Sequence, residues 1–300
     1  MKPFSEEDKS SNEIDLLLVE SILQGNREDL EKLILRYQQW IYNIALRMVW
    51  DPVDAEDITQ DILIKIITKL SSFQGKSTFK IWLYKIVKNH VLTMKKRTYE
   101  TMLSNFRQFR TVLEDLTDQD LPDKKSVPVE VPLLVEETKM GCIMGMITCL
   151  DREQRLIFIM GDIFGLSDTE GAPLFEISKD NFRQKLSRAR KQLINFMDNN
   201  CGLINEKNSC RCEKKTKASI EAGYVDPHTL RFADHYFQKV KDVVSDKTRQ
   251  WDGWMEQAYM KLFREQPFKP SPDFPLTLRK MLHSQEFQDI FSVSMADQSS

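Results

Sequence analysis

The chain has 300 residues, of which 41% are hydrophobic and 29% charged, and this length favours two or three modest domains over a single one. No stretch approaches the roughly 18–20 apolar residues that cross a bilayer, and the acidic, polar N-terminus lacks the basic and apolar blocks of a signal peptide, so we expect a cytoplasmic protein without membrane insertion. The formal net charge of −2 excludes no nucleic-acid partner, because a phosphate backbone responds to the local field and not to the sum of charges.

The composition predicts an all-α fold. The chain contains only 10 glycines and is rich in Leu, Ile, Lys, Glu and Gln, which favour helices over strands. Apolar residues at helical spacing predict two helices over residues 14–50, interrupted at Gly25-Asn26. These helices begin a first helical domain, which we expect over residues 10–110.

Two more long helices are expected in this domain. Asp51-Pro52 ends the second helix, and Asp54 is the expected N-terminal cap of a third helix with a regular apolar stripe. The composition of residues 71–77 predicts a loop, and a hydroxyl side chain at its end then caps a helix that runs to about Arg97.

The rest of the chain divides by composition. Residues 111–139 contain three prolines in an acidic context and predict a linker, with a short helix near 106–116. A second compact helical unit is expected over residues 140–200, and Gly165 should end its first long helix. Residues 201–300 predict a cysteine-containing helical extension.

Charge is segregated along the chain. Basic residues gather after Phe79 and again after Lys179, and an acidic stretch over residues 114–137 separates the two blocks. Lysines alternate with aromatic residues in the first block, which suits contact with unpaired bases, because stacking one base on an aromatic ring is worth about 1–3 kcal/mol. The structural alternative is that Leu83 and Ile86 share a core face with Phe79 while the lysines form a solvated face.

Three motifs of the first domain follow one another in a specific order. They are Asp54-Ala55-Glu56-Asp57-Ile58-Thr59-Gln60-Asp61, Phe73-Gln74-Gly75 and Phe79-Lys80-Ile81-Trp82-Leu83-Tyr84-Lys85-Ile86-Val87-Lys88-Asn89. Together they resemble region 2 of the extracytoplasmic-function (ECF) group of sigma-70 family RNA polymerase sigma factors. The resemblance implies that the loop over 73–77 holds a base flipped from the minus-ten promoter element and that the next helix contacts the separated strand. The implied minus-ten residues are Phe73, Lys76, Ser77, Lys80, Trp82, Tyr84, Lys85, Lys88 and Asn89.

The first of these motifs has a second implied role. In the family this stretch faces the clamp helices of the largest polymerase subunit, which makes Asp57, Gln60 and Asp61 the candidate polymerase contacts. Polar groups on one helical face suit an interface rim. The alternative is electrostatic, since carboxylates in a first turn stabilise a helix by a few tenths to about one kcal/mol.

The second unit resembles sigma region 4, whose helix-turn-helix reads the minus-thirty-five element. The motifs are Leu150-Asp151-Arg152-Glu153-Gln154-Arg155, Phe164-Gly165-Leu166-Ser167 and residues 177–193. Ser178 is the expected cap of the recognition helix, whose first turns reach base edges while later arginines contact phosphates. The implied minus-thirty-five residues are Ser178, Lys179, Asn181, Arg183, Gln184, Arg188 and Arg190. The chain departs from the family pattern at Glu170-Gly171-Ala172-Pro173, where Gly and Pro should weaken the first helix of the motif.

The extension carries a weak metal signal. Cys201, Cys210 and Cys212 with His228 or His235 suit zinc by residue type, but their spacing is not that of paired Cys-x-x-Cys ligands, so reduced thiols without a metal are the alternative. Residues after about 216 exceed the usual length of the ECF group, and we expect them to pack on the two domains through their many aromatic side chains and to regulate them. These aromatic residues are Tyr224, Phe232, Tyr236, Phe237, Trp251, Trp254, Tyr259 and Phe263.

The expected function is therefore that of a sigma factor, which binds core RNA polymerase and promoter DNA; the sequence leaves open an anti-sigma partner. An enzyme is disfavoured, because the four histidines are scattered and no phosphate-binding glycine loop or catalytic triad order is present. The alternative within transcription is a one-component helix-turn-helix regulator with a C-terminal sensor domain. It explains residues 140–197 but leaves the motif over 73–89 without a role.

Overall fold

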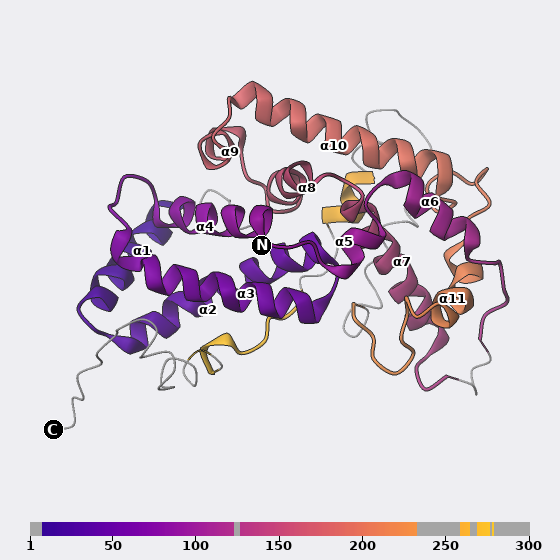
Figure 1. The fold of residues 1–300 in the computed structure, drawn as a ribbon, viewed down its shortest axis with the longest axis horizontal. Coiled ribbons are helices and arrows are strands. Elements are labelled where there is room, and N and C mark those ends of the chain that lie inside the picture. Colours follow the sequence, from indigo (N-terminus) through magenta and orange to yellow (C-terminus); the bar gives the residue numbers. More distant parts are fainter. Residues whose placement is uncertain (1–7, 123–126, 233–258, 265–268, 277, 279–300) are drawn as a thin grey trace.

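A computed structural model describes residues 8–122, 127–232, 259–264, 269–276 and 278 (Figure 1). Within these ranges the chain is helical, apart from one isolated β-bridge between Cys201 and Cys210, and the expected all-α fold is confirmed. None of the helices in the described ranges has the length and apolar character needed to cross a membrane.

The N-terminal half forms a bundle around α2 and α3, which pack along each other (Figure 1). Its elements are α1 (Asp8–Leu23), α2 (Arg27–Val49), α3 (Pro52–Lys69), the 3₁₀ turn η1 (Leu70–Ser72), α4 (Phe79–Thr93), α5 (Thr98–Met102) and α6 (Phe106–Asp115). The expected break between the first two helices is present, because Asn26 caps α2 by accepting hydrogen bonds from the backbone of Glu28 and Asp29.

The start of α3 differs from the sequence prediction. Asp51, not Asp54, is its N-terminal cap, and the Asp51 carboxylate accepts from the backbone N–H of Val53 at 2.9 Å and of Asp54 at 3.1 Å. Proline is favourable at the first helical position because its missing N–H has no partner there anyway. Pro52 therefore begins α3 and does not merely end α2.

The second half contains α7 (Val131–Thr148), α8 (Arg152–Phe158), the π-helical turn η2 (Ile159–Ile163), α9 (Asp168–Phe175), α10 (Lys179–Asn200) and α11 (Cys212–Glu221). Gly165 follows η2 with a φ of +79°, which agrees with its expected role as a helix stop. The segment 111–139, expected as a linker, contains the end of α6 and the beginning of α7.

The helix-turn-helix of α9 and α10 forms despite the unfavourable residues of α9. Ser167 and Glu170 build a reciprocal capping box at its start. At Gly171 a Cβ atom would stand 2.5 Å from the Phe182 ring, so glycine is what lets α10 approach α9 this closely. The prediction that Gly171 and Pro173 weaken this helix took no account of the capping box or of the close packing on Phe182.

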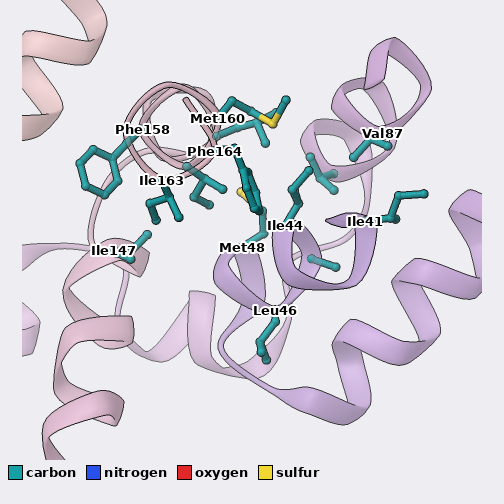
Figure 2. Packing of buried hydrophobic residues seen from close by; sticks show 14 of the residues in the cluster. Ile41, Ile44, Leu46, Met48, Val87, Ile147, Phe158, Met160, Ile163 and Phe164 are labelled. Atoms are coloured by element: carbon teal, nitrogen blue, oxygen red, sulfur yellow. The ribbon is translucent and has the colours of Figure 1, made fainter. Parts of the chain in front are cut away.

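The two halves share one hydrophobic core. Figure 2 shows Ile44 and Met48 of α2 beside Phe164 and Ile163 from the second half, with Phe158 and Ile147 on the same cluster. Phe164 is fully buried, and its ring packs edge-on against Trp40 of α2 with centroids 5.5 Å apart. The expected domains 10–110 and 140–200 are therefore in direct contact and bury apolar surface against each other.

Short C-terminal segments pack on both halves. Phe263 is buried against Phe158, with ring centroids 5.4 Å apart and the planes perpendicular. Further along, Lys269 and Asn43 of α2 exchange two hydrogen bonds of 3.0 and 2.9 Å between the Lys269 backbone and the Asn43 amide. The ring of Phe274 lies near Tyr42. Tyr236, Phe237, Trp251, Trp254 and His235 of the expected extension lie outside the described residues.

Candidate nucleic-acid interface

The loop that ends at α4 presents an aromatic cluster. Phe73 is half-buried and packs against Phe79 and Trp82, with ring centroids 5.4 and 5.6 Å away. Lys76 and Ser77 are exposed beside it. The Thr78 hydroxyl accepts from the Ile81 backbone and starts α4, as the sequence predicts. The loop thus offers a half-exposed aromatic face with a cation next to it, which suits an unpaired base.

The basic face of α4 is largely covered by the second half of the chain. Lys85 forms an ion pair of 2.9 Å with Glu176, the residue that ends α9, and Lys88 lies 3.9 Å from the same carboxylate. Burial lowers the pKa of Lys88, which is only 7% exposed. Lys80 and Trp82 are half-buried, and Asn89 is exposed.

Two of the minus-ten candidates are inaccessible in this arrangement. Tyr84 is 1% exposed and belongs to the core, and Lys88 faces α9 and not solvent. In this arrangement neither residue is presented to DNA as expected, because α4 is enclosed by α2 and α3 on one side and by α8 and α9 on another. Leu83 and Phe79 are core residues, as the structural alternative held, and Ile86 is only half-buried.

The recognition helix α10 exposes most of its candidates. Ser178 caps the helix by accepting from the Asn181 backbone at 3.1 Å. Arg183 is exposed and forms ion pairs with Asp168 and Asp180. The exposed candidates together are Ser178, Lys179, Asn181, Arg183, Gln184 and Arg188. The first turns of α10 thus form a polar, mainly basic surface that fits a major groove.

Arg190 is the exception on this helix. Its guanidinium makes a bidentate pair with the buried carboxylate of Asp162, at 2.7 and 3.0 Å, and Arg264 donates to the same carboxylate at 2.6 Å. The predicted phosphate contact at Arg190 is therefore not supported, because its charge is already used to neutralise a buried acid.

The candidate polymerase contacts lie on α3. Asp57 and Asp61 are exposed, and Gln60 is half-buried. Asp61 has a side chain that is 60% exposed and stands 3.9 Å from the imidazole of His90. Burial and the charge of Lys65 lower the pKa of His90, so this pair is not a strong ion pair at neutral pH. Asp57 and Asp61 therefore lie on the solvent-exposed side of α3.

A buried ionic cluster that sequence reasoning missed joins the two halves. Glu100 of α5 is 2% exposed and binds Arg152 through two hydrogen bonds of 2.9 and 2.7 Å and Arg155 through one of 2.8 Å. Arg155 also donates to backbone carbonyls of Thr148 and Leu150. Burial raises the pKa of Glu100, but the bonds from Arg152 and the charge of Arg155 outweigh it and hold that pKa below its ordinary value.

The metal-ligand candidates Cys201, Cys210 and Cys212 lie near the C-terminal end of α10, away from its exposed first turns. All five cysteines are free thiols. Within the described residues no group of three or more His, Cys, Asp or Glu side chains is already arranged to hold a metal ion. His228 is exposed, and His235 lies outside the described residues.

Two family models match the chain over the two surfaces just described. Sigma-70 region 2 matches residues 33–100, and sigma-70 region 4 matches residues 140–193. The chain belongs to the sigma-70 family. Within it this sigma factor is a member of the ECF group, and as sigma factors are non-enzymatic subunits, the expectation that it is not an enzyme is confirmed.

Curated relatives align with this sigma factor over about three fifths of its length. The RNA polymerase sigma-H factor of Pseudomonas aeruginosa is 27% identical over 188 residues, which cover 61% of the chain and 93% of the relative. The ECF RNA polymerase sigma-E factors of Haemophilus influenzae and Escherichia coli K12 are 27% and 25% identical over 186 and 185 residues, covering 60% of the chain and 94% and 93% of the relatives. A solved structure of CnrH in complex with the cytosolic domain of CnrY aligns with 62% of the chain and 97% of its own, at 19% identity and a TM-score of 0.44.

Proposed function

We propose that this sigma factor binds core RNA polymerase in the cytoplasm and directs it to promoters through the loop over 73–77 and the first turns of α10. The observation that carries the proposal is that these two exposed surfaces fall within the region 2 and region 4 matches. Phe73 and Lys76 receive the flipped minus-ten base, and Lys179, Asn181 and Gln184 read the minus-thirty-five element.

The test is run-off transcription with core polymerase and genomic fragments. A promoter-dependent transcript is the expected result, and its absence from every fragment would favour the one-component regulator. Asp61→Lys should weaken polymerase binding, whereas Glu114→Lys, at an exposed acid on α6, should not. Equal affinities of the two variants would remove α3 from the polymerase interface.

Promoter reading by Lys88 further requires the two halves to separate. Glu176 pairs with Lys85 and approaches Lys88, and because Lys88 is buried, a DNA strand can reach it only after α9 has moved away. A protein-induced change of this kind needs a partner that binds the separated state more tightly. Core polymerase is the partner we propose for this step.

We also propose that the C-terminal segments regulate this step by holding the halves together. Residues 259–264 contact the second half through Phe263 and Arg264, and residues 269–276 contact α2 through Lys269 and Phe274. Phe263→Ala and Phe274→Ala should increase the distance between fluorophores on α3 and α10 and raise promoter affinity. Leu276→Ala, on the same segment but 50% exposed, is the control. Unchanged distance and affinity in both phenylalanine variants would contradict this regulation.

A further inference from the structure

Four of the five cysteines come together from three separate segments. Cys142 lies on α7, Cys201 follows α10, and Cys210 and Cys212 lie at the start of α11, which packs along α7. Cys142, Cys210 and Cys212 line a common cavity of about 50 Å³, and Cys201 is held beside them through its β-bridge to Cys210. The chain thus places four thiols at one partly buried junction, more than a single disulfide uses.

The turn after Cys201 is closed by backbone hydrogen bonds from Ile204 and Asn205 to the Cys201 carbonyl, at 3.3 and 3.0 Å. Burial raises the pKa of the Cys201 thiol, and the backbone N–H groups of Leu203 and Ile204 act in the opposite direction. Gly202 donates to the Cys210 carbonyl at 3.1 Å, and a Cβ atom at Gly202 would stand 2.2 Å from that oxygen. Glycine is thus required at position 202 for the segments that carry Cys201 and Cys210 to lie side by side.

Charges around the thiols favour their anionic form, while burial opposes it. Burial first, and then the neighbouring thiols, raise the pKa values of Cys142, Cys210 and Cys212. Cations from two segments lie near the group, Lys139 on α7 and Arg211 and Lys215 at the start of α11, and they lower these pKa values. Glu136 and Asp118, which form ion pairs with Lys139 and Lys215, raise them. Four thiols in such a site are protonated until a cation replaces their protons.

We propose that Cys142, Cys201, Cys210 and Cys212 bind one thiophilic divalent cation, with zinc as the best fit to an all-sulfur tetrahedral set. Four S–H bonds are lost and four metal–sulfur bonds form, four protons leave to solvent, and no electron is transferred. The tetrathiolate centre carries two net negative charges, next to Arg211 and to Lys139 and Lys215, which would exchange part of their pairing with Glu136 and Asp118 for the centre.

The sulfurs must move to form this centre. In their present positions, no three or more described His, Cys, Asp or Glu side chains form a group that could hold a metal ion. A zinc–sulfur bond is about 2.3 Å long. The cavity that three of the thiols line gives their side chains room to turn toward one ion. The cation therefore completes the site and tightens the junction of α7, α10 and α11.

The site lies where the connection between the two regions is anchored. Lys215 donates to the Leu116 carbonyl, and the Gln119 backbone donates to the Lys214 carbonyl at 2.9 Å, so residues after α6 rest on α11. Metal binding would fix α11 and with it the path of the chain from region 2 to region 4. The first turns of α10, which carry the proposed base contacts, lie at the far end of that helix.

The experiment uses the full chain purified under reducing, anaerobic conditions. Elemental analysis should find about one zinc per chain. Replacement by Co²⁺ should give the visible and charge-transfer absorption of a tetrahedral cobalt thiolate, with protons released on binding. Serine substitution of Cys142, Cys201, Cys210 or Cys212 should lower Co²⁺ affinity at least about 100-fold, since even outer-shell partners are worth about 10–100-fold.

Cys149→Ser is the matched control. Cys149 caps the C-terminus of α7, the helix that carries Cys142, and is buried, but its thiol donates to the Gly145 carbonyl at 3.3 Å, so the variant should keep full metal content. A wild-type chain that holds no zinc and gives no cobalt thiolate absorption would overturn the proposal, and so would a Cys142→Ser variant with unchanged affinity. If a serine variant unfolds, chelation of the wild type decides the matter: it should lower the melting temperature, and an unchanged temperature would count against the site.

Discussion

Removing the charge of Glu100 should separate the two halves of the molecule. In Glu100→Gln the side chain keeps its size, but Arg152 and Arg155 lose the carboxylate that compensates them in a buried site. Breaking a buried pair in this way costs about 3–5 kcal/mol. Arg155 keeps its backbone carbonyl partners, so we expect the lower end, about 3 kcal/mol.

Urea unfolding followed by circular dichroism measures this loss, and small-angle scattering measures the accompanying expansion. Glu114→Gln is the control, because its ion pair with Arg110 is exposed on both sides and a helix pair of this kind is worth about 0.3–0.5 kcal/mol. A Glu100→Gln protein as stable and as compact as the control would refute the idea that this cluster holds the halves together.

The pH dependence of the same cluster has a definite sign. The folded-state pKa of Glu100 lies below its ordinary value of 4.5, so its carboxylate stabilises the fold above that value. This contribution is lost as the pH falls from 4.5 through the depressed pKa. Glu100→Gln should lack this part of the acid sensitivity, and identical acid profiles for the two proteins would contradict the assignment.

Three other substitutions have expected outcomes. Gly171→Ala should destabilise the helix-turn-helix by about 1–3 kcal/mol in urea unfolding, because its Cβ would stand 2.5 Å from the Phe182 ring. Gly141→Ala is the control and should not destabilise the protein, because its Cβ would have its nearest contact at 3.6 Å. Glu176→Gly relieves a φ of +61° and removes the ion pair with Lys85. Small-angle scattering should then show a more expanded chain, and this chain should bind single-stranded minus-ten DNA more tightly. An unchanged shape would speak against closure by Glu176. Arg188→Ala should weaken promoter binding by a similar factor on all sequences and reduce the salt slope by about 0.9, and a loss confined to one base position would show that it reads sequence instead.

The sequence predicted the helices well because their signals are local. The break at Gly25-Asn26, the cap at Ser178 and the stop at Gly165 depend on residues a few positions apart. The family and the class of function, inferred from motif order over residues 54–89 and 150–193, are confirmed by the two matched regions. The individual polymerase and promoter residues stay predictions.

The sequence did not predict the surroundings of three candidate DNA contacts, and the reason is different. Tyr84, Lys88 and Arg190 have the residue types and spacing of DNA contacts, but their environment is set by elements distant in sequence. No periodicity within α4 or α10 reveals that α9 covers one helix or that Asp162 pairs with the other. The available signal was Arg152 and Arg155, two arginines one turn apart next to the apolar run that starts at Leu156, which is compatible with a buried acid elsewhere in the chain.

The core shared by the two halves also affects the timing of synthesis. Helix α2 ends at Val49, and its partners Phe158 and Phe164 are added roughly 110 residues later. At about 5–20 residues per second, the apolar face of α2 is complete for about 5–20 s before the side chains that cover it exist. During each round of translation this face is exposed to other nascent chains and to chaperones.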